Sequence, residues 1–341
     1  MLNSFRTMDN DNLNNLYQVA YDDGNWATKV ITNDAEVMYT SGVTPVMNSM
    51  DANEDGKDII IIEGEKFIVG ESRDAMQYNK SNDKYALIRM LPAIAYSITK
   101  SNLSHVQDIA LAIGTPLTQA ALLKDQYIEY FKGKEVNFVY KNESFHLTFP
   151  YVQCYPQDYA VMLRNYDKHF KCQTVSILAD IGGGTTDVLI LEHIANKLSG
   201  GKTPVVKNKK TFNIGIIHLV NQIKSELSVM GIDARDEIIL NAIQGETVCH
   251  KYADYIGKTC VAFAEKFVRD LVSMLKENGY DLSYPVFFIG GGYKLLQAYF
   301  NKYDDEIFKI ADFDALENAR SFLWLLKEQM KKEAKGMMLC G

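Results

Sequence analysis

A run of small and polar residues between two apolar segments carries the clearest chemistry in this sequence. The apolar segments, 175–179 and 188–191, each have the length of a buried strand, and Asp180 follows the first of them. Glycines and threonines fill the turn that follows: Gly182, Gly183, Gly184, Thr185 and Thr186. Glycines let backbone N–H groups approach a ligand closely, and successive N–H groups in one turn form a concave anion site, to which threonines add hydroxyl donors. The stretch therefore predicts an anion site beside a carboxylate.

An anion site next to an acid needs a cation or water between the two. A phosphate group with hydrated Mg²⁺ meets that need most simply, because Mg²⁺ keeps several of its waters when it binds to proteins. A tight β-hairpin with a glycine-rich turn is the alternative that requires no ligand, and a single motif of this kind does not decide between them.

A similar arrangement occurs near the beginning of the chain. An apolar run is followed by Asp22, Gly24 and a polar turn, and Lys29 lies just inside the next strand-like run. The spacing of Asp22 and Gly24 repeats that of Asp180 and Gly182. A lysine at this place can reach the β- or γ-phosphate of a nucleotide as a point charge, and a surface lysine on a strand is the alternative.

The two hairpins are separated by about one domain length. Neither continues as strand, glycine loop and helix, which disfavours both a Rossmann fingerprint and a P-loop. Two hairpins of the same design at this interval predict two similar domains that face each other across a cleft.

A third glycine cluster, 290–292, follows the apolar run 285–289 and precedes a helix expected over 293–300. In the order strand, glycines and helix, the backbone approaches a ligand closely and the helix N-terminus faces that ligand. The cluster is therefore a third candidate for ligand binding.

One glutamine is a candidate for holding water. Pro156 suits the entry of a helix expected over 158–166, and this would put Gln157 in the first turn. A glutamine there can hold a water molecule with both its amide oxygen and its amide nitrogen. A solvated glutamine without a function is the alternative.

The remaining elements follow from apolar periodicity. The expected strands are 16–20, 30–31, 37–40, 59–63, 67–70, 109–113, 135–140, 145–149, 205–212 and 307–310. The expected helices are 84–99, 117–131, a long helix opened by 213–215, then 235–243, 252–276 and 315–331. Pro92 predicts a kink or a late start in the first helix. We expect 193–204 to be a polar surface connection and 332–341 to be a frayed tail.

Composition limits the function classes. With 341 residues, 47% hydrophobic and 23% charged, the chain is long enough for two globular domains. A net charge of −7 with interspersed acids and bases disfavours nonspecific nucleic-acid binding. No apolar run approaches the roughly 20 residues that span a bilayer. The first 15 residues are polar and rich in Asn, which is not the pattern of a signal peptide. Five cysteines without a CxxC pair fit a cytosolic protein with free thiols.

In this order, the motifs resemble those of the actin-like ATPase superfamily, which includes actin, bacterial filament proteins, heat-shock chaperone ATPases and sugar kinases. The matching segments are a first phosphate loop with Asp22, Gly24 and Lys29, a second phosphate loop at 180–187, an adenosine motif at 290–292, and connecting segments at 113–116 and 156–157. The sequence departs from the family pattern at Asn25, where a Ser or Thr is usual, and at Trp26. Gln157 is similar to the residue in actin, whereas ParM relatives often have a Glu there.

Within the superfamily, the sequence most resembles the ParM-type plasmid-segregation actins. The chain is a little longer than the two-domain core, which leaves no room for a chaperone's substrate domain or a large sugar-kinase insertion. The segment 213–217, the helix through Lys224, and 317–320 resemble segments of ParM-type and archaeal actin-like sequences. An amphipathic terminal helix, expected of a membrane-bound shape or division actin, is not evident.

The resemblance implies an α/β fold of the actin type, with two similar domains of mixed β-sheets flanked by helices around a central nucleotide cleft. Domain I would be 1–170, and domain II would be 171–341, with the C-terminal helix returning to domain I. The implied ligands are ATP or ADP, with GTP as an alternative, and Mg²⁺.

The resemblance also assigns roles to residues of this chain. Gln157 would orient the attacking water and Asp180 would accept a proton late; both are implied as catalytic. Asp22 and Asp180 would hold Mg²⁺ through water. The implied nucleotide-binding residues are Asp22, Gly24, Asn25, Trp26, Lys29, Gly182, Gly183, Gly184, Thr185, Thr186, Lys224, Gly290, Gly291 and Gly292.

The implied function is that of a cytoplasmic bacterial ATPase that polymerises into dynamic filaments for plasmid DNA segregation. Its partners would be further copies of itself and a DNA-bound adaptor protein, with no direct specific contact to DNA and none to a membrane. Two alternatives remain: a small-molecule kinase of the actin-like and sugar-kinase superfamily, and a nucleotide-dependent regulator that does not form filaments.

Overall fold

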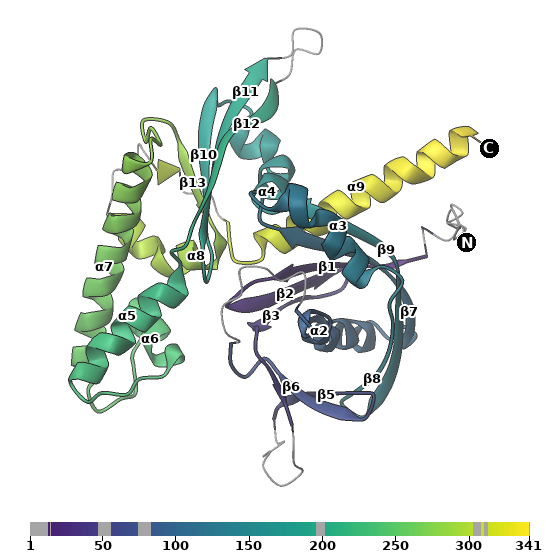
Figure 1. Ribbon diagram of the computed structural model, residues 1–341, viewed down its shortest axis with the longest axis horizontal. Helices are drawn as coiled ribbons and strands as arrows, with labels where there is room; N and C mark the ends of the chain where they lie inside the picture. Colours follow the sequence, from purple (N-terminus) through teal and green to yellow (C-terminus); the bar gives the residue numbers. More distant parts are fainter. Residues whose placement is uncertain are drawn as a thin grey trace. The chain divides into compact units, whose positions relative to one another are not determined.

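The computed structural model describes residues 13, 15–46, 56–73, 83–195, 202–302, 308–309 and 313–340. The chain divides into two compact units. Unit 1 lies within 1–164 and 318–341, and unit 2 lies within 165–317. The chain leaves unit 1 after helix α4 (Tyr159–Arg164) and returns to it in the last helix, α9 (Glu317–Cys340). In Figure 1, where colours follow the sequence, α4 is teal and α9 is yellow.

Unit 1 is built on one mixed sheet of nine strands in the order β3-β2-β1-β7-β9-β8-β5-β6-β4. The strands are β1 (Tyr17–Asp23), β2 (Ala27–Thr32), β3 (Glu36–Thr40), β4 (Val43–Pro45), β5 (Asp58–Ile62), β6 (Glu65–Val69), β7 (Val106–Thr115), β8 (Glu135–Tyr140) and β9 (Glu143–Pro156). β1, β7 and β9 are parallel neighbours, and the other neighbouring pairs of this sheet are antiparallel. The carboxyl ends of these three parallel strands meet at one edge, where open α/β sheets bind their ligands.

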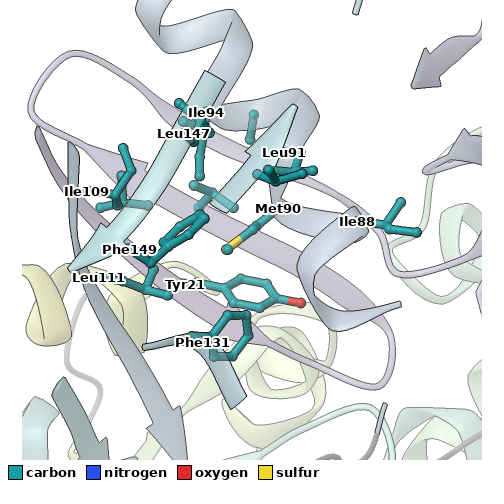
Figure 2. Close-up of a cluster of buried hydrophobic side chains, with 14 of the residues drawn as sticks. Tyr21, Ile88, Met90, Leu91, Ile94, Ile109, Leu111, Phe131, Leu147 and Phe149 are labelled. Atoms are coloured by element: carbon teal, nitrogen blue, oxygen red, sulfur yellow. The ribbon is translucent and has the colours of Figure 1, made fainter. Parts of the chain in front are cut away.

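Helix α2 (Ala86–Lys100) lies inside the curve of this sheet (Figure 1). Its residues Met90 and Leu91 belong to one core cluster with Phe149 of β9, shown in Figure 2. The helix runs through Pro92, so the late start that this proline suggested is wrong. Proline removes one backbone hydrogen bond, but the burial of its apolar neighbours outweighs that loss.

Helices α3 (Ala120–Phe131), α4 and α9 complete unit 1. Two elements are longer than predicted: β9 extends well beyond 145–149, and α9 continues through 332–340, where we expected a frayed tail. Two hydrogen bonds join α9 to β9: Tyr151 Oη to Glu333 Oε2 at 3.0 Å and Tyr155 Oη to Gln329 Oε1 at 2.9 Å. The polar end of α9 is therefore stabilised by hydrogen bonds to a strand that is distant in the sequence. Local composition cannot reveal such contacts.

Unit 2 contains a five-stranded mixed sheet in the order β12-β11-β10-β13-β14. Its strands are β10 (Val175–Ile181), β11 (Thr186–Ala195), β12 (Lys202–Phe212), β13 (Val286–Ile289) and β14 (Phe308–Lys309). Its helices are the π-helical turn η1 (Tyr166–Phe170), α5 (Ile216–Val229), α6 (Asp236–Ile243), α7 (Ala253–Glu277) and α8 (Gly290–Phe300). α5 to α8 pack against one another, and β14 lies at the sheet edge, as predicted. No helix in the described ranges of the two units is long and apolar enough to cross a membrane.

The prediction that 193–204 is a polar surface connection is wrong at both ends of this segment. β11 continues to Ala195 and β12 begins at Lys202, so that His193 pairs with Pro204 in the antiparallel ladder. His193 is only 4% exposed, and its Nε2 lies 2.9 Å from Ser176 Oγ. The polar composition of this segment belongs to the ends of a hairpin whose outer strand is a sheet edge, where lysines discourage pairing with other chains.

Candidate functional site

The first candidate loop is the turn between β1 and β2. These strands are antiparallel, and Asp22 is directly opposite Lys29, so their side chains share one face of the sheet. Lys29 Nζ donates to Asp22 Oδ2 at 2.8 Å, and Asp22 is 1% exposed. Gly24 closes the turn by donating its N–H to the carbonyl oxygen of Ala27 at 3.1 Å. A Cβ at Gly24 would lie 2.6 Å from that oxygen, so the turn requires a glycine here.

Asn25 and Trp26 form the tip of this turn. Both of their carbonyl oxygens accept hydrogen bonds from Ser41, one from its hydroxyl and one from its N–H, each at 3.0 Å. The Arg73 guanidinium lies 5.4 Å from the centre of the Trp26 ring. Asn25 and Trp26, where the sequence departs from the family pattern, are thus held through their own backbone carbonyl oxygens. Their side chains are half-buried.

Gln157 reaches the first loop from the end of β9. Its Nε2 donates to Asp22 Oδ1 at 3.0 Å, and its backbone N–H donates to the carbonyl oxygen of Thr115 at 2.9 Å. The predicted position in a helical first turn is wrong: Pro156 ends β9, and α4 begins only at Tyr159. The parallel order β1-β7-β9 explains this, because it places the ends of all three strands at one edge of the sheet.

The second candidate loop lies in unit 2, between β10 and β11. Gly182 N–H donates to the carbonyl oxygen of Thr185 at 2.9 Å and closes the turn. The carbonyl oxygens of Gly182 and Gly183 accept the N–H groups of Ile216 and Ile217, the first residues of α5, at 3.2 and 2.8 Å. With the carbonyls bound to the helix, the N–H groups of Gly183 and Gly184 have no backbone acceptor among the described residues. This arrangement fits the anion cradle that the glycines predicted.

Gly215 is a site residue that the sequence did not single out. A Cβ on this glycine would lie 2.7 Å from the carbonyl oxygen of Gly182 and 2.6 Å from that of Gly183, so only glycine allows α5 to approach the loop. Its N–H donates to Nδ1 of His218 at 3.2 Å. The signal available in the sequence was its place directly before a long amphipathic helix, which indicates a cap but not a contact with a distant loop.

The two threonines of this loop differ in role. Thr186 is fully buried, and its hydroxyl donates to the carbonyl oxygen of Ile214 at 2.7 Å, so it holds the loop to the segment before α5. The Thr185 hydroxyl lies 3.4 Å from Asp187 Oδ2. Asp187 is buried and accepts a hydrogen bond from Thr211; burial and the charge of Asp180, directly opposite on β10, raise its pKa to about 6. The sequence reasoning gave Asp187 no role.

The third glycine cluster contacts the second loop. Gly290 has a φ of +90°, and a Cβ there would lie 2.0 Å from Oδ1 of Asp180. A Cβ at Gly292 would lie 2.6 Å from the carbonyl oxygen of Ile181, whereas one at Gly291 would meet nothing closer than 3.5 Å. The glycines form the first turn of α8 and do not precede the helix, which corrects the predicted start at 293. Two of the three are therefore required by close packing on the strand that carries Asp180.

Lys224 is a predicted site residue whose ion pair lies outside both loops. It lies on α5 and forms an ion pair with Asp236 of α6. Its role in nucleotide binding stays a prediction.

The described residues contain no group of three or more His, Cys, Asp or Glu side chains that could hold a metal by themselves. Mg²⁺ does not require such a group, because it is usually bound by one or two carboxylates, water and substrate phosphates. Asp22 in unit 1 and Asp180 in unit 2 each offer carboxylate oxygens, which are the hard donors that Mg²⁺ prefers.

Comparisons with known proteins bear on the fold. Residues 178–302 match the family model of the C-terminal part of the archaeal actin homologue MreB-like proteins, a segment that contains the second loop and α5 to α8. The structure is similar to that of Ta0583, an archaeal actin homologue (18% identity, TM-score 0.70, 92% of this chain and 100% of that chain). It is also similar to a 15-stranded ParM filament from Clostridium botulinum (17%, 0.69, 92% and 99%) and to the actin-like protein Alp7A (14%, 0.72, 94% and 99%). No curated protein sequence matches the chain.

These comparisons establish the fold. The chain has the actin-like fold of mixed β-sheets flanked by helices, as the resemblance of its motifs implied. Another similar structure is Ta0583 in complex with ADP (18% identity, TM-score 0.66, 92% of this chain and 100% of that chain).

Proposed function

We propose that this protein binds and hydrolyses ATP and polymerises into filaments, in the manner of ParM-type plasmid-segregation actins. The observation that supports this most directly is the hydrogen-bonded group of Gln157, Asp22 and Lys29, which lies at the ends of β1 and β9 and the start of β2 in one sheet. It brings together an amide that can orient water, a buried carboxylate and a cation. These are the parts that phosphoryl transfer to water requires, since positioning and charge stabilisation supply most of its catalysis.

Each residue has a defined part in the proposed reaction. The N–H groups of Gly183 and Gly184 bind phosphate oxygens, and Lys29 offsets charge on the outer phosphates. Asp22 and Asp180 would offer carboxylate oxygens to hydrated Mg²⁺, which would neutralise phosphate charge. Gln157 orients the attacking water; glutamine is a poor base, so Asp180 accepts the proton late.

The base of the nucleotide is assigned to the first turn of α8, and Lys224 is kept as a nucleotide-binding residue. The close packing of Gly290 on Asp180 supports this proposal, because it puts the start of α8 beside the second loop. ATP is the proposed nucleotide, in line with the ADP complex of the similar archaeal homologue, and GTP is the alternative.

Filament formation is proposed from the kind of proteins that share this fold. A ParM filament and the filament of Alp12 (17% identity, TM-score 0.60) are both similar in structure to this chain. Binding of ATP would select one conformation of the subunit, and addition to a filament would favour it. A DNA-bound adaptor in the cytoplasm would then be the partner of the filament, without specific contact between this chain and DNA.

Sedimentation and light scattering with Mg²⁺–ATP, Mg²⁺–ADP and no nucleotide test the proposal, together with phosphate release. We expect assembly with ATP above a critical protein concentration and phosphate release that rises cooperatively with that concentration. A monomer under all three conditions over a wide concentration range would contradict filament formation. Phosphate transfer that needs an added alcohol would favour the small-molecule kinase, and nucleotide binding without assembly would favour a regulator.

A further inference from the structure

A buried arginine connects helix α2 to the first loop. Arg89 is 2% exposed and binds Asp23 with two nitrogens, Nε to Oδ1 and Nη2 to Oδ2, each at 3.0 Å. Nη2 also forms an ion pair with Asp83. Because a guanidinium is planar and offers donors in a fixed fork, this bidentate pairing fixes the orientation of the Asp23 carboxylate as well as its position.

Asp83 belongs to the start of α2. Its Oδ1 accepts the N–H of Tyr85 at 2.9 Å, and its carbonyl oxygen accepts the N–H of Ala86 at 3.1 Å. Arg89 therefore joins the first turn of α2 to the end of β1. The group holds two carboxylates for one guanidinium, and a buried arrangement of this kind is costly unless every partner stays in place.

Asp23 follows Asp22, so the two side chains point to opposite faces of β1. One carboxylate faces Lys29 and Gln157, and the other faces Arg89. Gly24, which closes the turn, comes next in the chain. Anchoring Asp23 on one face of the sheet therefore fixes the backbone that presents Asp22 on the other face.

We propose that Arg89 is a positioning residue: through Asp23 it holds the first loop in its binding conformation before any nucleotide arrives. The role of the loop in nucleotide binding rests on the function proposed above, whereas the ordering of the loop does not. Lysine cannot replace the bidentate fork, so the positioning depends on arginine and not only on positive charge.

The same helix offers a matched control at the other end of the hairpin. Ser97 is fully buried on α2, and its hydroxyl lies 2.7 Å from Tyr17 Oη and 2.6 Å from Thr32 Oγ1. Tyr17 begins β1 and Thr32 ends β2, so this contact anchors the end of the hairpin away from the turn. Removing it should destabilise the unit without loosening the first loop.

The experiment compares Asp23→Asn, Arg89→Lys and Ser97→Ala in the full chain by amide hydrogen exchange without nucleotide and by ATP binding. We expect exchange of the peptide 22–29 to rise by about tenfold or more in the first two variants, since tenfold is the low end of the loss for a hydrogen bond to a charged group, and ATP affinity to fall similarly. Ser97→Ala should leave both unchanged, even where it lowers the melting temperature. If Arg89→Lys fails to fold, Asp23→Asn decides.

Unchanged exchange over 22–29 in Asp23→Asn would overturn the inference, and so would an equal rise in Ser97→Ala. The exchange measurement uses no nucleotide, so it decides the positioning role even if the wild-type chain fails to bind ATP, a result that would refute the proposed function instead.

Discussion

The side-chain amide of Gln157 donates a hydrogen bond to the carboxylate of Asp22, although the two residues are 135 positions apart in the chain. The parallel strands β1, β7 and β9 cause this contact, since their carboxyl ends meet at one edge. Asp22 uses its other oxygen to bind Lys29. One buried carboxylate therefore positions both the residue proposed to orient water and the residue proposed to offset phosphate charge.

Gln157→Ala tests the catalytic proposal. We expect ATP hydrolysis to fall by about 100-fold, the loss that misplacing a reacting group by about 1 Å can cause, with little change in ATP affinity. Single-turnover phosphate release and equilibrium binding measure the two effects. Gln153→Ala, on β9 four residues before Gln157, is the control and should keep wild-type turnover. Full turnover in Gln157→Ala would refute the assignment.

Lys29→Met separates stability from binding. Asp22 is buried, so removing its cation leaves an unpaired carboxylate and should cost about 3 kcal/mol in the free energy of unfolding. The double variant Asp22→Asn/Lys29→Met has no unpaired charge and should regain most of that stability while still binding ATP poorly. Chemical denaturation and calorimetric titration measure both quantities. If ATP affinity returned together with stability, Lys29 would have no direct role at the phosphates.

Adjacent glycines of α8 provide a sharp comparison. Gly290→Ala puts a methyl group against Asp180 and strains a backbone with φ of +90°, so we expect a loss of about 1–3 kcal/mol or more in the free energy of unfolding and a loss of ATP binding. Gly291→Ala meets only an ordinary contact at 3.5 Å with Ala315 and should be neutral or slightly stabilising. Thermal unfolding of the two variants checks this. Equal effects would show that the start of α8 tolerates movement away from the second loop.

The sequence predicted the parts of the candidate site whose structure is local. The strands that flank Asp22 and the glycines at 182–184 run apolar in a recognisable way, and both turns lie where the sequence predicted them. The same holds for the long amphipathic helices, such as α7, whose periodicity is strong.

Long-range contacts explain what the sequence did not reveal. Gln157 was expected in a helix because Pro156 often begins one, yet pairing of β9 with β7 extends the strand to that proline. Gly215 is required by the carbonyls of Gly182 and Gly183, which are distant in sequence. The polar residues around His193 were predicted to be surface, although the ladder between β11 and β12 buries this side chain.

His193 predicts how stability depends on pH. Burial, together with the charge of Lys202, lowers its pKa, and its Nδ1 is buried without a hydrogen-bond partner among the described residues. Below the ordinary histidine pKa of about 6.5, the unfolded chain therefore binds more protons than the folded chain. The contribution of His193 to the free energy of unfolding should therefore fall as the pH drops from about 7 to 5. Burial also lowers the pKa of His169, which adds to this fall, whereas the raised pKa of Asp187 opposes it.

His193→Gln cannot be protonated, so the loss of stability below about pH 6.5 should be smaller in this variant than in the wild type, whatever the substitution does to stability at neutral pH. Ser176→Ala is the matched control, because it removes the hydroxyl beside Nε2 at 2.9 Å but keeps the histidine. That variant should lose stability at every pH and retain the wild-type slope of stability against pH. Denaturant unfolding of the full chain at half-unit pH steps measures the three curves. A wild-type slope that persisted in His193→Gln would assign the acid sensitivity to other groups, because only a proton taken up by this imidazole on unfolding can be removed by that substitution.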